Sequence, residues 1–121
     1  LVRLSAAGSA KLPYYAIYGI GSPTPIMEKY NYSVLIKMVA AAKNELPPDK
    51  PLHLFGAGHP MILPFMVALG VDTFDSASYI LYARDERYLT VYGTHKLAEL
   101  EYFPCNCPVC SKYTPRELRD L

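Results

Sequence analysis

The chain has 121 residues, of which 51% are apolar, and a formal net charge of +1. This composition excludes a disordered chain, and no apolar run approaches the roughly 20 residues of a transmembrane helix, so we expect a cytoplasmic protein without a membrane partner. The near-neutral charge leaves a nucleic-acid partner open, because a local basic patch can bind phosphates whatever the total charge.

Three apolar segments predict buried strands in the first part of the chain. They cover residues 14–21, 52–55 and 71–75, and loops rich in glycine or proline follow the first two. Helical patterns lie between the strands. Because strands that alternate with helices form parallel sheets with right-handed crossovers, the predicted fold class is α/β.

The two predicted helices that connect these strands differ in quality. Apolar residues recur at helical spacing over 34–46, which indicates an amphipathic helix. The second helix is expected over 60–69, with a proline in its first turn and Gly70 at its end. Pro64 lies inside this second segment, so we expect a kink or an interruption there.

The sequence becomes more polar after a boundary that we place near residue 85. A hairpin or a short helix is expected in this part, with a turn at Gly93. The last segment predicts a helix start, since Thr114 can cap it, Pro115 suits its first turn and Glu117 completes a capping box.

The stretch "PCNCPVC" holds all the cysteines of the chain, Cys105, Cys107 and Cys110. Three thiolates at this spacing can surround one Zn²⁺ ion, which takes four cysteine or histidine ligands in structural sites. The cluster is one ligand short, and His95 lies ten residues upstream of it. The alternative is that the three thiols are small buried side chains.

The stretch "GVDTFDS" places Asp75 at the end of a predicted strand. The carboxyl ends of parallel strands face the ligand crevice in α/β folds, and a carboxylate there can act as a nucleophile or a base. Asp72 lies three residues earlier, so strand alternation sends it to the opposite side. The alternative role of Asp75 is to cap the helix that follows it.

Two other stretches carry weaker signals. In "HLFGAGHP", glycines allow a close approach to a flat ligand and Phe55 could stack on a base, although Phe55 could equally belong to the core. We expect His59 to be a loop residue or a helix-start partner. In "YARDERY", Arg84 and Arg87 are one turn apart if helical, and form either a solvated face or phosphate contacts.

Four longer stretches occur in one order: "IGSPTPIMEKY", "PLHLFGAGHPM", "GVDTFDSASYILYARDERYLT" and "LEYFPCNCPVCSKYTPRELR". In this order and spacing they resemble the archaeal tRNA-guanine transglycosylases, and they extend from about Tyr14 to the end of the chain. The resemblance implies the later part of a (β/α)8 TIM barrel with an inserted zinc-binding subdomain. Residues 1–85 are then a partial TIM-barrel catalytic domain and residues 86–121 an incomplete zinc-binding subdomain.

The resemblance also implies a reaction. Members of this family exchange a guanine in the D-arm of tRNA for 7-cyano-7-deazaguanine, the precursor of archaeosine, through a covalent intermediate between an aspartate and C1′ of the ribose. The implied partners are therefore tRNA and a 7-deazaguanine base. The matching residues are Asp75 as the nucleophile, Gly21, Ser22, Phe55 and Gly56 around the base, Arg84 and Arg87 on RNA, and Cys105, Cys107 and Cys110 on Zn²⁺.

Some features depart from the family's pattern. Its fourth zinc ligand, a histidine, would lie beyond Leu121, and its second catalytic aspartate before Leu1. Pro23 also removes a backbone N–H from the loop beside the base. We therefore expect a fragment that is inactive alone and needs the remainder of the enzyme or a homodimer partner. The alternatives are a non-catalytic zinc-stabilised subunit of a split transglycosylase, and an enzyme that exchanges queuine-type or DNA bases.

Overall fold

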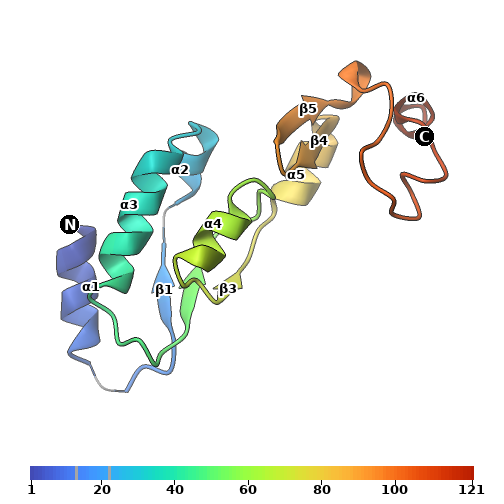
Figure 1. Ribbon diagram of the computed structural model, residues 1–121. Coiled ribbons are helices and arrows are strands. Elements are labelled where there is room, and N and C mark those ends of the chain that lie inside the picture. Colours follow the sequence, from blue (N-terminus) through green and yellow to red (C-terminus); the bar gives the residue numbers. More distant parts are fainter. Residues whose placement is uncertain (13, 22) are drawn as a thin grey trace.

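The computed structural model describes residues 1–12, 14–21 and 23–121. It confirms the α/β class: a parallel sheet with helices precedes a hairpin and an extended C-terminal segment (Figure 1). The helices are α1 (Val2–Ala10), α2 (Thr24–Glu28), α3 (Tyr32–Lys43), α4 (Leu63–Ala68), α5 (Ser78–Arg84), the 3-10 helix η1 (Leu97–Glu99) and α6 (Pro115–Arg119). The strands are β1 (Tyr18–Ile20), β2 (Leu52–Leu54), β3 (Thr73–Phe74), β4 (Arg87–Thr90) and β5 (Gly93–Lys96).

The first sheet has the order β1-β2-β3, and both strand pairs are parallel, as predicted. In its register Gly19 pairs with His53, and His53 pairs with Thr73. The strands are shorter than predicted. β1 begins only at Tyr18, because its pairing partner β2 begins at Leu52, directly after Pro51. Residues 14–17 therefore precede the strand and are exposed. The described residues form an open sheet and not a closed barrel.

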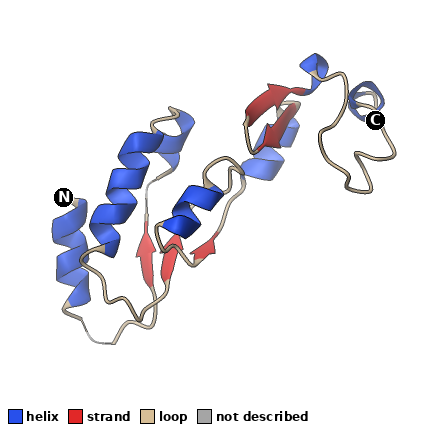
Figure 2. Cartoon of the chain, viewed as in Figure 1, coloured by secondary structure: helices blue, strands red, loops and turns tan. Residues whose placement is uncertain are grey.

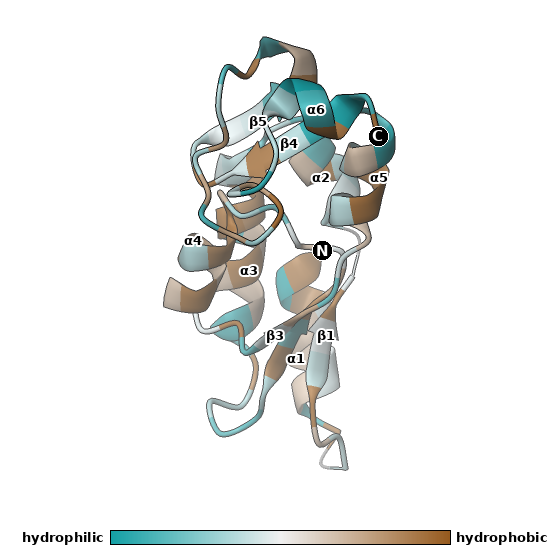
Figure 3. Ribbon diagram, turned by 90° about the vertical axis from the view of Figure 1, so that its right-hand side faces the viewer, coloured by the Kyte–Doolittle hydropathy of each residue, from teal (hydrophilic) through white to brown (hydrophobic). Residues whose placement is uncertain are grey.

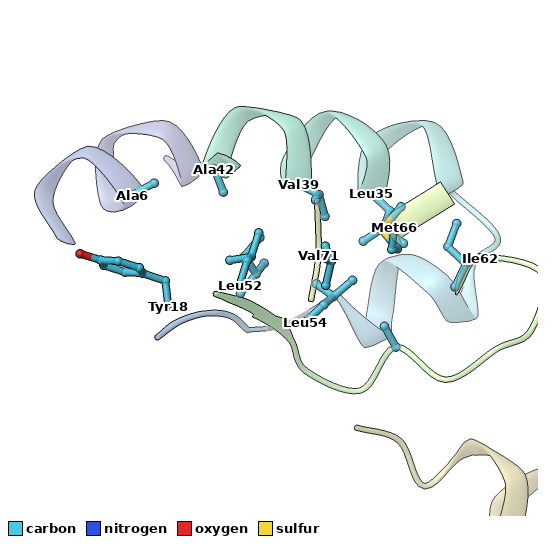
Figure 4. Close-up of a cluster of buried hydrophobic side chains, with 12 residues drawn as sticks. Ala6, Tyr18, Leu35, Val39, Ala42, Leu52, Leu54, Ile62, Met66 and Val71 are labelled. Atoms are coloured by element: carbon cyan, nitrogen blue, oxygen red, sulfur yellow. The ribbon is translucent and has the colours of Figure 1, made fainter. Parts of the chain in front are cut away.

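One face of this sheet carries the core. Alternate strand residues are fully or nearly fully buried against α1, α3 and α4, among them Tyr18, Leu52 and Leu54 (Figure 4). Leu35 of α3 and Met66 of α4 pack into the same cluster. Burying a side chain of this size contributes about 1.5–3 kcal/mol. The other face presents Gly19, His53 and Thr73, since successive strand residues point to opposite sides.

The first long helix forms where it was predicted, but the second begins later. α3 covers Tyr32–Lys43 and buries its apolar face. α4 begins only at Leu63, so the expected start at residue 60 is wrong, and Pro64 lies in its first turn and not at a kink. A turn precedes it, in which the Met61 N–H donates to Nδ1 of the buried His59. His59 is therefore a loop residue, the first of its two predicted roles, and it makes no side-chain cap of α4.

The C-terminal part is built from short elements. β4 and β5 form an antiparallel hairpin (Figure 2). The hairpin, and not a short helix, is therefore the structure of this segment, and Gly93 lies at its turn. α6 has the predicted capping box: the Glu117 N–H donates to Thr114 Oγ1, and Glu117 Oε2 accepts from the Thr114 N–H. α6 is strongly hydrophilic, whereas apolar residues gather on α3 and α4 (Figure 3).

Polar contacts connect the hairpin to its surroundings. His59 Nε2 lies 2.9 Å from Thr94 Oγ1. Because Nδ1 of the neutral His59 ring accepts a hydrogen bond from the Met61 N–H, Nε2 is the donor to Thr94. Glu86 pairs with Arg119 of α6 at 2.8 Å. Within the described part of the chain, no helix combines the length and the apolar character needed to cross a membrane.

Candidate active site and thiol cluster

Asp75 follows β3 directly, at the edge of the sheet where the parallel strands end. Its Oδ1 accepts the backbone N–H of Gly56 at 3.0 Å, and His53 Nε2 lies 3.0 Å from the same oxygen. The side chain is nonetheless 59% exposed. The carboxylate is therefore held in place by two neighbouring segments and remains open to a ligand.

The surroundings of Asp75 favour its charged form. The Gly56 N–H, and after it the His53 ring, hold the pKa of the Asp75 carboxyl below its usual value. Hydrogen bonds to a carboxylate stabilise the anion over the acid. Asp75 is therefore ionised at neutral pH, which is the state that a nucleophile or a base requires.

The alternative role of Asp75 as a helix cap is wrong. Ala77 occupies the position before α5, and it is Ser76 Oγ that accepts the Ser78 N–H at 3.0 Å. Asp72 lies on the other side, as predicted, where its Oδ2 accepts the Leu52 N–H at 2.8 Å. Asp72 thus binds the backbone at the start of β2, and Asp75 faces the open end of the sheet.

Phe55 and Gly56 form the loop that carries this edge. Phe55 is 52% exposed, so its alternative assignment to the core is wrong. Its ring packs edge-on against His53, with centroids 4.4 Å apart, and lies so close to Gly19 that a Cβ there would be 2.7 Å from Phe55. Gly56 has a φ of +70°, and a Cβ on it would lie 2.5 Å from Thr24 Oγ1. A side chain at either glycine would displace its neighbours.

The other two residues predicted near a base lie in the loop after β1. Gly21 is exposed, and open space surrounds the position where its Cβ would be. Ser22 lies outside the described residues. The adjoining Pro23 is fully buried.

Arg84 and Arg87 would be one turn apart in a helix, but the segment that joins them is not helical. Arg84 is the last residue of α5, Arg87 is the first of β4, and Glu86 between them has a φ of 51°. Both arginines line a hollow of about 500 Å³ together with three tyrosines: Tyr30, Tyr32 and Tyr82. Arg87 lies 4.1 Å over the Tyr82 ring and pairs with Asp85, whereas Arg84 is exposed.

The three thiols converge in the C-terminal loop. The Sγ atoms of Cys105, Cys107 and Cys110 all lie within 4.8 Å of one another, and the residues are half-buried. A tetrahedral Zn²⁺ with bonds of about 2.3 Å needs sulfurs about 3.8 Å apart. The donor set therefore fits this ion after a small contraction, and the alternative of three fully buried side chains is wrong.

Hydrogen bonds shape the thiol cluster. The Cys107 N–H donates to Cys105 Sγ at 3.3 Å, and the Cys110 N–H to Cys107 Sγ at 3.4 Å. The second of these donors is the main cause that lowers the pKa of Cys107 to about 7. The hydroxyl of Tyr88 lies 3.5 Å from Cys110 Sγ, and burial raises the pKa of this phenol.

None of the three histidines, all of which lie in the described part of the chain, joins the thiol cluster. His95 Nε2 lies 3.4 Å from Thr90 Oγ1 within the hairpin, and His53 and His59 contact Asp75 and Thr94. The cluster found among the described residues contains the three cysteines alone.

Comparison with known proteins shows the family to which the sequence belongs. Residues 1–121 match the family described as "Queuine tRNA-ribosyltransferase". The chain belongs to this family. It is 59% identical to the "tRNA-guanine(15) transglycosylase" of Aeropyrum pernix over 121 residues, which cover 100% of this chain and 24% of that protein. The proteins of the same name from Thermococcus kodakarensis and Saccharolobus solfataricus are 56% and 54% identical, over 99% and 100% of this chain and 21% and 24% of their own lengths.

The chain thus spans about a quarter of the length of these relatives. Sequence reasoning missed His53 and Thr73. His53 contacts Asp75, the candidate nucleophile, and Thr73 contacts His53. A signal was present: 73 and 75 are two residues apart on one strand face, and His53 is the polar residue of an apolar strand. The sequence alone does not show the strand register that pairs His53 with Thr73.

Proposed function

We propose that these residues form the nucleophile-bearing part of a tRNA-guanine transglycosylase. The reaction exchanges a D-arm guanine of tRNA for 7-cyano-7-deazaguanine in archaeosine biosynthesis. The observation that carries this proposal is the ionised, exposed carboxylate of Asp75, held by Gly56 and His53 where parallel strands end. Family membership and the names of the archaeal relatives support it.

In the first step, a carboxylate oxygen of Asp75 attacks C1′ of the ribose that carries the target guanine. The C1′–O bond forms as the C1′–N9 bond breaks, and the electron pair leaves with guanine, whose N9 takes up a proton. A carboxylate suits this step because it captures the positive charge that develops at C1′.

In the second step, N9 of 7-cyano-7-deazaguanine loses its proton and attacks C1′. The bond between C1′ and the Asp75 oxygen breaks, and its electron pair restores the carboxylate. The new C1′–N9 bond leaves the tRNA with the exchanged base. Because one oxygen of Asp75 both attacks and departs, the residue is regenerated without any redox change.

The loop residues around Asp75 would hold the base. The exposed Phe55 ring offers a flat apolar surface, and Gly21 and Gly56 let the backbone approach closely. Ser22 is proposed for the same pocket. The target nucleotide would have to leave its stack to reach the carboxylate.

Arg84 and Arg87 are proposed to contact the tRNA backbone. They line the hollow that also contains Gly56, and arginine is suited to bidentate contact with phosphate. Arg84, which is exposed, is the stronger candidate, because the guanidinium of Arg87 already engages Asp85 and Tyr82. Exchange of Arg84 for glutamine should weaken tRNA binding.

Cys105, Cys107 and Cys110 would hold a structural Zn²⁺, with a histidine outside this stretch as the proposed fourth ligand. When bound, the ion supplies folding free energy to a loop that has little core of its own. We propose residues 86–121 as part of a zinc-binding subdomain inserted in a (β/α)8 barrel, of which residues 1–85 form the later part.

Catalysis is tested in the complete enzyme that contains this sequence. Incubated with labelled tRNA and no incoming base, it should form a covalent protein–RNA adduct that survives a denaturing gel. Asp75→Asn should abolish the adduct. Asp49→Asn, which changes an exposed carboxylate in the loop before β2 and not after a strand, should leave it intact. An adduct that forms at the normal rate with Asp75→Asn would contradict the proposal.

A non-catalytic, zinc-stabilised subunit of a split enzyme predicts a different result. The adduct would then form on a partner polypeptide, and Asp75→Asn would leave it unchanged. The family description "Queuine tRNA-ribosyltransferase" also keeps queuine as an alternative incoming base. Competition between the two bases in the exchange assay separates these enzymes.

A further inference from the structure

His53 occupies the centre of β2 and faces away from the core. Its neighbours Leu52 and Leu54 are at most 1% exposed, and their side chains pack against the helices. The His53 side chain is 19% exposed and lies on the open face beside Gly19 and Thr73. A polar ring at this position contributes little to the apolar core, so its role lies on the open face.

Both ring nitrogens of His53 have a partner. Nδ1 lies 2.8 Å from Thr73 Oγ1, and Nε2 lies 3.0 Å from Asp75 Oδ1. A carboxylate only accepts hydrogen bonds, so Nε2 must carry the proton. In the neutral ring Nδ1 then accepts from the Thr73 hydroxyl. The three side chains thus form one directed chain, in which Thr73 donates to His53 and His53 donates to Asp75.

The contact from His53 selects one oxygen of the nucleophile. Among the described residues, the hydrogen bonds from Gly56 and His53 both end on Asp75 Oδ1, and none ends on Oδ2. These two donors, a side chain of β2 and a backbone N–H of the loop that follows β2, fix the orientation of the carboxylate plane. The oxygen without these donors, Oδ2, keeps its lone pairs for an incoming atom.

The ring itself is held in place from a second side. Phe55 packs edge-on against it, with ring centroids 4.4 Å apart and an interplanar angle of 73°. Ile17, Tyr18 and Gly19 complete a hollow of about 440 Å³ that His53 and Phe55 line. His53 therefore belongs to the same surface as the proposed base contact and the proposed nucleophile.

We propose that His53 is a positioning residue of the exchange reaction, which orients Asp75 so that Oδ2 attacks C1′, and that the Thr73 hydroxyl fixes the ring tautomer this requires. The inference rests on the proposed function of Asp75. It assigns to His53 no contact with the tRNA. Loss of the His53 donor therefore slows formation of the adduct and leaves the affinity for tRNA unchanged.

Two amide variants separate positioning from a structural role in the complete enzyme. The amide nitrogen of glutamine reaches the place of Nε2, so His53→Gln keeps a donor for Asp75. The amide of asparagine reaches only the place of Nδ1, so His53→Asn keeps the contact with Thr73 and loses the donor. The adduct rate in a single turnover should fall about 10- to 100-fold in His53→Asn, the range of one charge-assisted hydrogen bond, and by less than about fivefold in His53→Gln.

Thr73 is tested through a double-mutant cycle. Thr73→Val, which removes the hydroxyl at constant shape, should slow the adduct rate, and Thr73→Ser should preserve it. In a His53→Phe background Thr73→Val should have no further effect, because the hydroxyl acts through the ring. Equal adduct rates in His53→Asn and His53→Gln, or additive effects of Thr73→Val and His53→Phe, would overturn the inference.

The outcomes also separate this inference from the proposed function. If the unmodified enzyme forms its adduct at a residue other than Asp75, the proposed function fails. If the adduct forms on Asp75 and the His53 variants retain the normal rate, only the positioning role fails. Thermal unfolding of each variant shows that it is folded, and its dissociation constant for tRNA should stay within about twofold of the unmodified enzyme, since a single lost contact exceeds this factor.

Discussion

Gly56→Ala is the substitution that tests the geometry of the strand-end site most severely. The residue has a φ of +70°, and a Cβ would lie 2.5 Å from Thr24 Oγ1. The backbone conformation alone costs about 1–2 kcal/mol for a residue with a Cβ, and the close contact adds to it. The loop must therefore shift, and its N–H leaves Asp75 Oδ1, where it lies at 3.0 Å.

The loss of this donor has a kinetic consequence. The carboxylate loses one of its two hydrogen-bond donors, so the rate of adduct formation should fall about 10- to 100-fold in the complete enzyme, the same range as for loss of the His53 donor. The Gly56 N–H is also the main cause of the lowered pKa of Asp75. Since the carboxylate is the reactive form, the substitution raises this pKa and moves the acid limb of the rate profile to higher pH.

A second substitution separates the two causes. Thr24→Ala removes the oxygen that a Cβ on residue 56 would meet. The double variant with Thr24→Ala and Gly56→Ala should therefore recover the part of the rate loss that the close contact causes. The part of the rate loss that the positive φ causes should remain. Single-turnover rates over a range of pH give both quantities. A Gly56→Ala enzyme with a normal rate and an unmoved acid limb would refute the role assigned to this loop.

The remaining predictions concern the core and the thiol cluster. Leu54→Ala should lower the free energy of unfolding by about 2–5 kcal/mol, because the side chain is fully buried, whereas Leu4→Ala, at a residue 77% exposed, should change it little; a denaturant titration that finds equal effects contradicts the assigned core. Tyr88→Phe removes the hydroxyl beside Cys110 and should weaken zinc binding about 10- to 100-fold in a chelator competition. The matched control is Tyr102→Phe, which removes the hydroxyl of an exposed tyrosine. Unchanged zinc affinity in Tyr88→Phe would separate this hydroxyl from the metal site.

Much of this architecture is contained in local sequence patterns. Alternation of apolar strands and helices predicts the parallel sheet, and position relative to the strands predicts that Asp75 and Gly56 lie at one edge. The capping box at Thr114 is readable because all its partners are within three residues. The convergence of the cysteines is readable for the same reason, since all three lie within six consecutive positions.

The errors arise where distant segments decide the outcome. β1 is short because Leu52 is the residue that pairs with Tyr18, and no local pattern contains that register. Arg84 and Arg87 are separated by a left-handed residue, Glu86, at a place where propensity favours continuation of the helix. The contact between His53 and Asp75 joins residues 22 positions apart, so only the folded sheet reveals it.

The central claim is that Asp75 becomes covalently attached to the ribose of the tRNA. The most direct measurement is to trap the adduct of the complete enzyme, digest it with protease and ribonuclease, and locate the modified residue by mass spectrometry. The account predicts a ribose-derived mass on the peptide that contains Asp75, with fragmentation placing it on that carboxylate. A modification on any other residue, or on a separate polypeptide, would contradict it.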